Sequence, residues 1–490
     1  MKQTAESMRF WHRLLPWAVG TAALFSSAFL MFRRPWFDEV LTINLLTRLP
    51  WFKIYFAYEI PNNHIVFTLL EKFWFGFIGC FTGFSCFYFR LVPMLCGAAA
   101  VFLLTRRLIR AGGIVSGVLA AASLAVSPVY AMYATAVRGY MTGFLLTVLA
   151  MLQAEKLIRC GRRRDHWIFF LLALLAAGTT PTNLAAFAGI AVYFLPQCLR
   201  HGKSGIRRLV FLAAASAAAL VLFYLPILDK FIGCIRLGEG WHSAGSAVYV
   251  LYTGALFPWT GLLVFVLAGG IYLWVKYPRL RPRCVCGLLT FLLPLAAYAV
   301  MKVPPFPRVF FPLTAVWMFS IAYALDGFFR LCRRKKTVTA LVIGLQAVFC
   351  LMFLQERAEN AGSFLYGTDG RGDDYIAPYY ARSSFLPNKM LEYLMNKYRE
   401  EGDFRVFATF DSDAPSLVFA SMLVRDFPSE ILLVDPLNRP KTLRLQDYPG
   451  RKYIICSGTG DLNRTLSRFG LRSAGLEKQF GIQQLYRVTE

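Results

Sequence analysis

The sequence predicts a polytopic α-helical membrane protein with a small C-terminal α/β domain outside the cytoplasm. Three observations lead to this prediction: 57% of the 490 residues are hydrophobic, only 17% are charged, and apolar runs recur at lengths that can cross a bilayer. A soluble domain has roughly 25% charged residues and far fewer phenylalanines than the 44 of this chain. The composition therefore excludes an ordinary cytosolic enzyme, a disordered chain and a disulfide scaffold.

Eleven apolar runs are long enough to be transmembrane helices, so we expect about 11 spans plus juxtamembrane helices. They begin near Leu14, Leu91, Ile114, Tyr140, Trp167, Leu184, Leu209, Thr260, Val285, Val309 and Val338. Residues 62–80 are not counted, because a span there would carry Glu71 and Lys72 into the bilayer. We expect an interfacial helix on the outer surface at 62–80, and a second interfacial piece at 247–257.

The orientation follows from the uneven distribution of the net charge of +25. The residues before Glu356 hold 35 basic and only 10 acidic side chains, whereas the rest of the chain has 18 of each. A uniformly basic chain would suggest nucleic acid, but this excess lies in short loops between apolar runs. The positive-inside rule explains it and predicts that five basic clusters and the N-terminus are cytoplasmic. The clusters are at 106–110, 159–164, 200–208, 276–283 and 330–336.

The composition changes near Glu356, which predicts a transmembrane domain at 1–354 and a soluble extracytoplasmic domain at 355–490. Short β-rich runs in the second part predict strands, and two further segments predict helices. The strands are expected at 404–410, 430–435, 452–456 and 482–488, and the helices at 413–425 and 459–470.

An acidic pair, Asp38 and Glu39, lies just beyond the first span, in the run RRPWFDEV. One interpretation is solvated loop charge beside Arg33 and Arg34. The other is a general base with a neighbour that orients it or holds a cation.

Three arginines mark the outer ends of later helices: Arg90, Arg138 and Arg308, with Lys302 near the last. An arginine in such a place can simply extend toward lipid headgroups. Three that converge near Asp38 would instead form an anion site, and lipid phosphate suits the two-pronged donors of arginine.

Five motifs occur in a particular order along the first two thirds of the chain. They are Asp38-Glu39 after Trp36-Phe37, the segment NNHIVFTLLEKFWFGFIG with His64, Arg90-Leu91-Val92-Pro93, Ser127-Pro128 through Arg138-Gly139-Tyr140, and Arg308 to Pro312. In this order and spacing they resemble GT-C glycosyltransferases, specifically protein O-mannosyltransferases and bacterial lipid A aminoarabinose transferases. The resemblance covers roughly residues 15–350.

The resemblance implies a sugar donor carried on a polyprenyl phosphate and transfer on the outer side of the membrane with inversion. It implies Asp38 as the catalytic base and Glu39 as the group that orients it. The donor phosphate would be bound by the arginines at 90, 138 and 308 together with Lys302. Further candidate substrate contacts are His64, Asn63, Tyr140, Glu239 and His242.

No Gly-rich phosphate loop is visible, and the five histidines show no paired ligand spacing, so no cofactor is predicted. A divalent cation held by Asp38 and Glu39 stays open. The expected partners are the lipid-linked donor, the bilayer and a glycolipid, glycan or protein acceptor, in a bacterial inner membrane. A transporter, a lipid-linked glycan polymerase or ligase, and an inactive scaffold are the alternatives. A transporter would be expected to carry acids or broken helices within mid-membrane spans.

Overall fold

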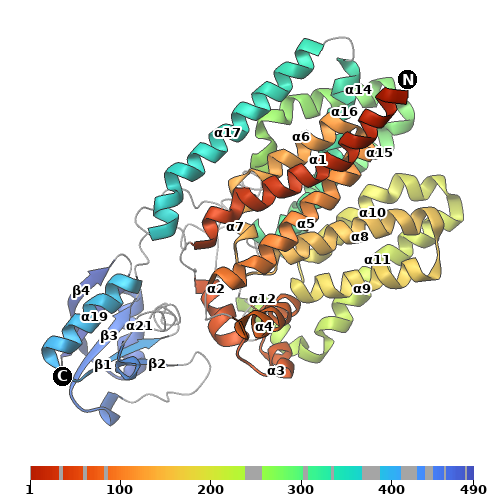
Figure 1. Cartoon of the computed structure of the whole chain (residues 1–490). Helices are drawn as coiled ribbons and strands as arrows, with labels where there is room; N and C mark the ends of the chain where they lie inside the picture. Colours follow the sequence, from red (N-terminus) through yellow and green to blue (C-terminus); the bar gives the residue numbers. More distant parts are fainter. Residues whose placement is uncertain are drawn as a thin grey trace. The chain divides into compact units, whose positions relative to one another are not determined.

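The computed structural model describes most of the chain (Figure 1). The described residues are 2–32, 37–58, 63–81, 86–237, 256–301, 307–332, 336–366, 387–409, 427–435, 445–456, 459–480 and 483–489. Contacts divide the chain into two compact units. We call residues 1–32 and 49–359 the helical unit, and residues 33–48 and 360–490 the C-terminal unit.

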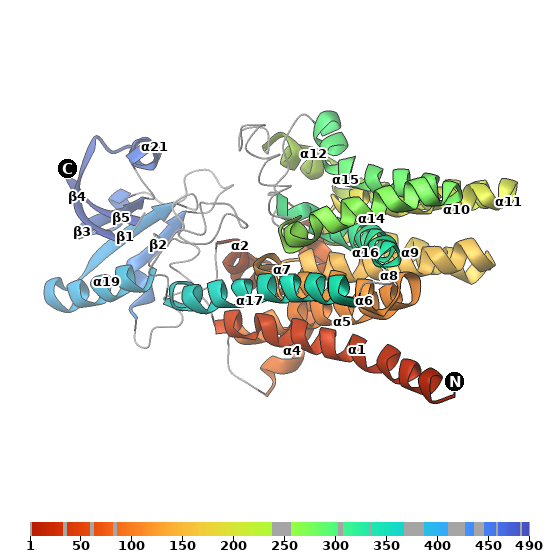
Figure 2. The same ribbon diagram turned by 90° about the horizontal axis from the view of Figure 1, so that it is seen from above.

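Each of the 11 predicted apolar runs falls on a helix. These helices are α1 (Lys2–Ala28), α5 (Cys86–Gly112), α6 (Ile114–Ala125), α8 (Tyr140–Cys160), α9 (Arg163–Thr179), α10 (Asn183–Arg200), α11 (Gly202–Tyr224), α14 (Leu263–Lys276), α15 (Arg281–Met301), α16 (Thr314–Leu331) and α17 (Lys336–Tyr366). In two perpendicular views α1, α5 and α6 lie side by side (Figure 1, Figure 2). The 21 residues of α8 give it a length of about 31 Å, which matches the hydrocarbon thickness of a bilayer.

Among the described helices, seven are long and apolar enough to cross a membrane, and an eighth span results if α6 and α7 (Pro128–Ala134) count as one. That pair is bent by 62°. Three predicted spans, on α1, α9 and α10, are not among these eight.

Short helices gather at one end of the helical unit. They are α3 (Trp51–Phe56), α4 (Ile65–Gly79) and α12 (Leu228–Leu237). A buried cluster of Tyr58, Ile65, Tyr224, Ile227 and Cys234 joins them. The 15-residue α4 covers the segment predicted as interfacial and is not among the candidate spans. Residues 247–255, the larger part of the second predicted interfacial piece, lie outside the described residues.

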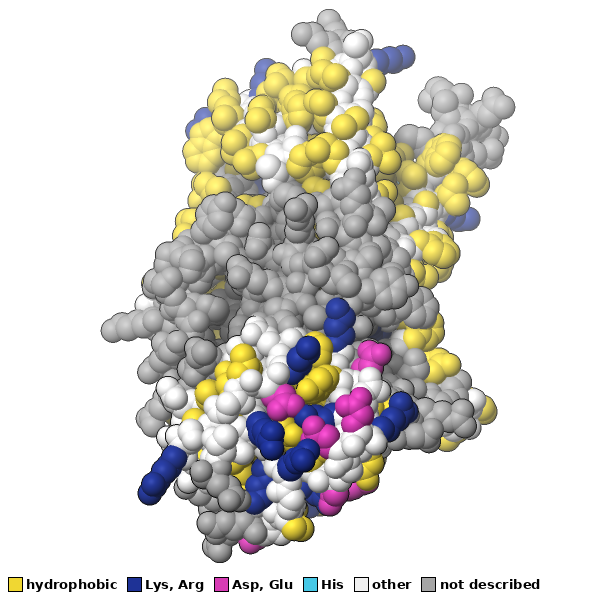
Figure 3. Space-filling view, turned by 90° about the vertical axis from the view of Figure 1, so that its left-hand side faces the viewer, with side chains coloured by type: hydrophobic (Ala, Val, Ile, Leu, Met, Phe, Trp, Pro, Cys, Tyr) yellow, Lys and Arg dark blue, Asp and Glu magenta, His cyan; other side chains and the backbone are white. Residues whose placement is uncertain are grey.

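The C-terminal unit contains a five-stranded sheet in the order β2-β1-β3-β5-β4. The strands are β1 (Phe404–Thr409), β2 (Leu432–Asp435), β3 (Arg451–Cys456), β4 (Ser473–Phe480) and β5 (Gln483–Thr489). β1 pairs in parallel with β2 and β3, while β5 is antiparallel to β3 and β4. Charged side chains of both signs are mixed on the exposed face of this unit, as expected for a surface in water (Figure 3).

Both faces of this sheet are covered, because successive side chains of a strand point to opposite sides. Tyr453 and Ile455 of β3 join the core beneath α19 (Pro387–Glu401), and Ile454 and Cys456 pack on the other face with residues of α21 (Thr459–Phe469). Four strands and the helix at 459–470 confirm the sequence predictions. The strand β4 and the helix α19 were not predicted, and the expected helix at 413–425 lies outside the described residues.

Also in the C-terminal unit, the segment 33–48 contains α2 (Phe37–Val40) followed by a π-helical stretch, η2 (Leu41–Leu46).

Candidate active site

The described residues among the predicted polar residues of the helical unit lie at the end opposite the basic clusters. α8 begins at Tyr140 and ends beside Arg159, and α10 begins at Asn183 and ends at Arg200. Both helices therefore run from the end with the predicted polar residues to the end with the basic clusters. The turn before α8 and the turn between α9 and α10 share one end, which we call the polar end.

Arg138 is held in a tight turn between α7 and α8. Pro128 starts α7 after the break from α6, and the Ser127 hydroxyl caps it by accepting a hydrogen bond of 3.1 Å from the backbone of Tyr130. After α7 the backbone N–H of Arg138 donates to the carbonyl of Ala136 at 2.7 Å. The Arg138 side chain is only 3% exposed, and its guanidinium carbon lies 5.8 Å from the centre of the Tyr140 ring. This is a cation–π contact inside the protein.

His64 joins three elements at the polar end. It precedes α4, and its Nδ1 lies 2.9 Å from the backbone carbonyl oxygen of Thr179, at the end of α9. Since a carbonyl oxygen only accepts, this contact makes Nδ1 the protonated ring nitrogen. The ring also meets Tyr140 edge-on at 5.2 Å. The structure thus brings together three of the predicted residues, His64, Arg138 and Tyr140.

Gly139 makes this close approach possible. A Cβ atom at this position would lie 2.5 Å from Cγ2 of Thr179 and 2.8 Å from Nδ1 of His64. Both distances are shorter than van der Waals contact. The turn therefore tolerates only glycine without displacing its neighbours.

Tyr58 is a residue of this end that sequence reasoning missed. It is 3% exposed, and desolvation raises the pKa of its phenol well above the usual value. The positive charge of Arg138 lowers that pKa in small part. The only sequence signal was a tyrosine in the polar lead-in before His64.

The 3-10 helix η7 (Pro307–Leu313) also reaches the polar end. The Thr182 hydroxyl donates to the carbonyl of Val309 at 3.3 Å, and Tyr133 and Phe311 have their ring centres 4.9 Å apart. The backbone that carries Arg308 is therefore at this end. The side chain of Arg308 lies outside the described residues, as do the predicted residues Lys302, Glu239 and His242.

Two predicted residues of the helical unit, Arg90 and Asn63, donate hydrogen bonds to backbone carbonyls. The side chain of Arg90 is fully buried, and its Nη1 donates to the carbonyl of Met31 at 2.7 Å. The Nδ2 of Asn63 donates to the carbonyls of Ile54 at 2.7 Å and Ala57 at 2.8 Å. Its Oδ1 accepts from Thr68 at 3.1 Å. Asn63 thus fastens α3 to the start of α4.

The acidic pair lies on α2 in the C-terminal unit. Asp38 is 7% exposed and Glu39 is fully buried, so neither is a solvated loop charge. The Thr42 hydroxyl donates to the backbone carbonyl of Asp38 at 3.0 Å, which ties α2 to the π-helical stretch after it. Among the described residues, no group of three or more His, Cys, Asp or Glu side chains is arranged to hold a metal ion.

Together these features define a polytopic helical membrane protein with a buried polar cluster at one end. The chain is similar to the crystal structure of ArnT from Cupriavidus metallidurans in the apo state, with 14% identity, a TM-score of 0.56 and 98% of each chain covered. It is also similar to the structure of the same ArnT bound to undecaprenyl phosphate, with 13% identity, a TM-score of 0.55 and 97% of each chain covered. No family model matches the sequence, and no curated protein matches it significantly.

The likeness over nearly the whole chain shows the fold. The protein has the fold of these ArnT structures, and the polytopic helical membrane fold class predicted from the sequence is confirmed.

Proposed function

We propose that this protein is an inverting glycosyltransferase that moves a sugar from a polyprenyl-phosphate donor to an acceptor hydroxyl on the outer face of the membrane. The observation that supports this most is the likeness, across 97% of both chains, to ArnT bound to undecaprenyl phosphate. ArnT is a lipid A aminoarabinose transferase, and its structure holds undecaprenyl phosphate. The donor proposed for this protein has a lipid carrier of the same kind.

The polar end of the helical unit has chemistry that suits a lipid phosphate. Arg138 presents a guanidinium in a buried setting beside Tyr140, where an ionic hydrogen bond is stronger than in water. A donor with a long hydrocarbon tail can enter between helices and leave its headgroup at such an end. Arg138 would then stabilise the charge that builds up on the leaving phosphate.

Arg90 is better suited to position the chain than to contact the donor. Its guanidinium donates to the carbonyl of Met31, shortly before the segment that carries Asp38. We propose that it fixes the end of the first helical stretch, and that the donor phosphate is bound by Arg138 together with Arg308 and Lys302.

In the proposed reaction the Asp38 carboxylate accepts the proton of the acceptor hydroxyl while that oxygen attacks the anomeric carbon. The bond from the anomeric carbon to the phosphate oxygen breaks, and the lipid phosphate leaves as an anion. A single displacement inverts the anomeric configuration. Glu39 orients Asp38 or the acceptor, and His64 contacts the substrate next to Arg138.

The test is transfer activity of the Asp38→Asn protein in membrane vesicles that contain polyprenyl-phosphate sugars. Loss of a general base lowers rates by about 10²–10⁴-fold, and we expect a loss in that range. Asp229→Asn is the matched control, because this carboxylate is exposed on α12, which belongs to the same end of the helical unit. Wild-type transfer by Asp38→Asn would refute the base assignment. Passage of the lipid-linked sugar across the vesicle without transfer would favour a transporter.

A second variant tests the phosphate role. Arg138→Lys keeps the charge but loses the two-pronged donor geometry. We expect a higher KM for the lipid donor with a smaller change in KM for the acceptor. An unchanged donor KM would count against Arg138 as a phosphate ligand.

A further inference from the structure

A cavity of about 830 Å³ lies at the end of the helical unit opposite the polar end. Its walls come from the ends of α5, α8 and α10, from the start of α15 and from the middle of α16. Five arginines line it: Arg107, Arg110, Arg159, Arg200 and Arg283. They come from four of the five basic clusters, so these clusters share one end, which we call the basic end. Its cytoplasmic placement stays a prediction of the positive-inside rule.

The positive charge in the cavity is only partly compensated. Glu155 is the single acid among the lining residues, and it accepts from Nε of Arg107 at 2.6 Å and from Arg159 at 2.5 Å. Five guanidinium groups against one carboxylate leave a formal excess of four positive charges. Arg110, Arg200 and Arg283 have no ion pair with the described residues.

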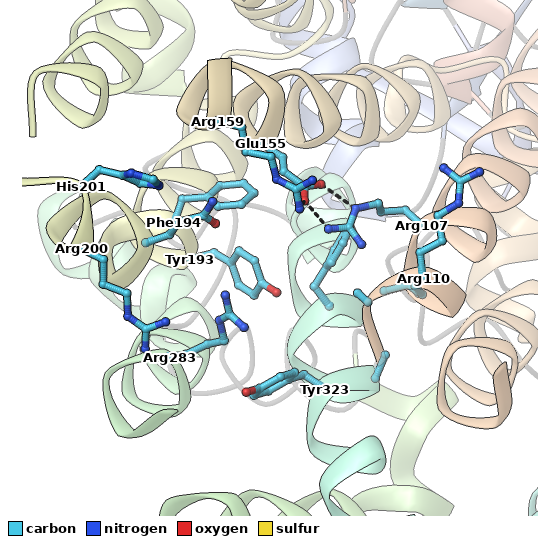
Figure 4. A pocket seen from close by; sticks show the side chains of 15 residues that line it. Arg107, Arg110, Glu155, Arg159, Tyr193, Phe194, Arg200, His201, Arg283 and Tyr323 are labelled. Atoms are coloured by element: carbon cyan, nitrogen blue, oxygen red, sulfur yellow. Dashed lines mark hydrogen bonds and ion pairs between the residues drawn. The ribbon is translucent and has the colours of Figure 1, made fainter. Parts of the chain in front are cut away.

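The five arginines surround a shared space, and Arg110, Arg159 and Arg200 are also exposed to solvent. Arg200 in addition donates to the backbone carbonyl of Arg279. Figure 4 shows Arg107 and Arg110 on one side, Arg200 on the opposite side, and Tyr193 between them. The guanidinium of Arg283 lies 5.3 Å from the ring centre of Tyr323, and that ring also lines the cavity. The positive-inside rule needs cations in loops, but it does not need them to face one another around a cavity.

The donors define the chemistry of the ligand. Guanidinium groups and tyrosine hydroxyls donate hydrogen bonds, and arginine matches the oxygens of phosphate in particular. Acceptors are fewer than donors in this lining, and the one carboxylate among the lining residues is already bonded to two arginines, so the cavity favours an anion over a neutral sugar. A metal cation is excluded by the charge. Phe194 and Phe319 add an apolar wall to the cavity. The ligand therefore either carries an apolar group next to its phosphate or places its phosphate alongside this wall.

We propose that this basic cavity is a phosphate-binding site, separate from the donor site at the polar end. The phosphate belongs either to the headgroup of an anionic membrane lipid or to a water-soluble phosphorylated compound. Both have the same ionic oxygens, and a cavity of this volume accommodates either. The proposal does not depend on the transferase activity, because the site is at the other end of α8 and α10.

Two probes distinguish the two sources. Purified full-length protein in phosphatidylcholine nanodiscs with added phosphatidylglycerol is examined by native mass spectrometry for retained anionic lipid. The same protein in pure phosphatidylcholine nanodiscs is titrated with inorganic pyrophosphate by calorimetry. The test variant is Arg110→Gln with Arg283→Gln, and each lost arginine is expected to weaken binding by about tenfold.

The matched control is Arg163→Gln with Arg164→Gln. These arginines are exposed at the same end and do not line the cavity, so the pair removes the same net charge. Ala111→Trp is a second test that keeps every arginine, because Ala111 lines the cavity, is exposed and can carry a bulky side chain that fills the space.

Binding that the control retains and both cavity variants lose supports the proposal. Retention of phosphatidylglycerol alone assigns a lipid headgroup, binding of pyrophosphate alone assigns a soluble ligand, and binding of both assigns a general phosphate site. Binding of neither probe, or an equal loss in the control, overturns the proposal.

Discussion

The substitution Gly139→Ala tests the packing that brings His64 and Arg138 together. The added methyl carbon would lie 2.5 Å from Cγ2 of Thr179 and 2.8 Å from Nδ1 of His64. Carbon atoms in contact lie about 3.5–4.0 Å apart, so Thr179 has to move by roughly 1 Å. Overpacking of this kind costs about 1–3 kcal/mol in a closely packed interior.

The displacement falls on the contact between His64 and the Thr179 carbonyl, so a functional effect is expected beside the loss of stability. A misplacement of about 1 Å in a catalytic site can lower the rate by about 100-fold. We expect Gly139→Ala to lower the unfolding midpoint in detergent by several degrees and to reduce transfer strongly.

Gly76→Ala is the matched control for this experiment. Gly76 lies in α4, and a Cβ atom there would have nothing within 4 Å. Alanine is a better helix former than glycine by up to about 1 kcal/mol, so this variant should be slightly more stable than wild type. If Gly139→Ala unfolds at the wild-type temperature, the close approach of the turn, Thr179 and His64 is refuted.

Three further predictions concern buried or paired charges. Glu71 is fully buried and neither carboxylate oxygen has a hydrogen-bond partner among the described residues, so desolvation raises its pKa well above the usual value. The melting temperature of the wild-type protein should therefore fall as pH rises from 5 to 8, and Glu71→Gln should abolish this pH dependence. If the variant shows the same pH dependence as wild type, the prediction is wrong. Lys397→Met should destabilise the C-terminal unit by about 1–3 kcal/mol, because the Lys397 side chain is 7% exposed and pairs with Glu401 and Glu477. Hydrogen exchange of β1 and β3 measures this loss. The control Lys389→Met, at an exposed position, should leave the stability unchanged. Hydrogen bonds from Lys397 and Arg451 lower the pKa of Glu401 from 4.5 to about 2. The contribution of Glu401 to the stability of the C-terminal unit is therefore complete above pH 4.5 and is lost on acidification toward pH 2. Hydrogen exchange of β1 and β3 as a function of pH measures this loss.

Much of the architecture could be predicted from the sequence because the determining signals are local. Apolar runs of sufficient length specify helices wherever they occur, and all 11 runs are helical. β3 was recognisable because it is buried on both faces and reads as a continuous apolar run. β4 was missed because most of its residues are exposed at the edge of the sheet, which left a polar sequence with no alternation to detect.

The candidate site was predictable only in part. His64, Arg138 and Tyr140 stood out by residue type and order, and they do meet at the polar end. Tyr58 did not stand out, because its burial against Tyr224 and Phe231 depends on which helices lie next to each other after folding. Asn63 and Arg90 donate hydrogen bonds to backbone carbonyls of other segments. The sequence pattern of side chains could not reveal these partners, because they are backbone groups brought close by folding.

The sequence by itself determined a helical membrane protein, the positions of its long apolar helices, the grouping of its basic loops and the small α/β domain at its end. These features depend on hydrophobicity and charge read over one segment at a time. Only the tertiary structure decided that four basic clusters surround one cavity, and that Gly139 lets His64 reach Thr179. Both depend on which helices lie next to each other, and helix pairing is fixed by packing between segments far apart in the chain.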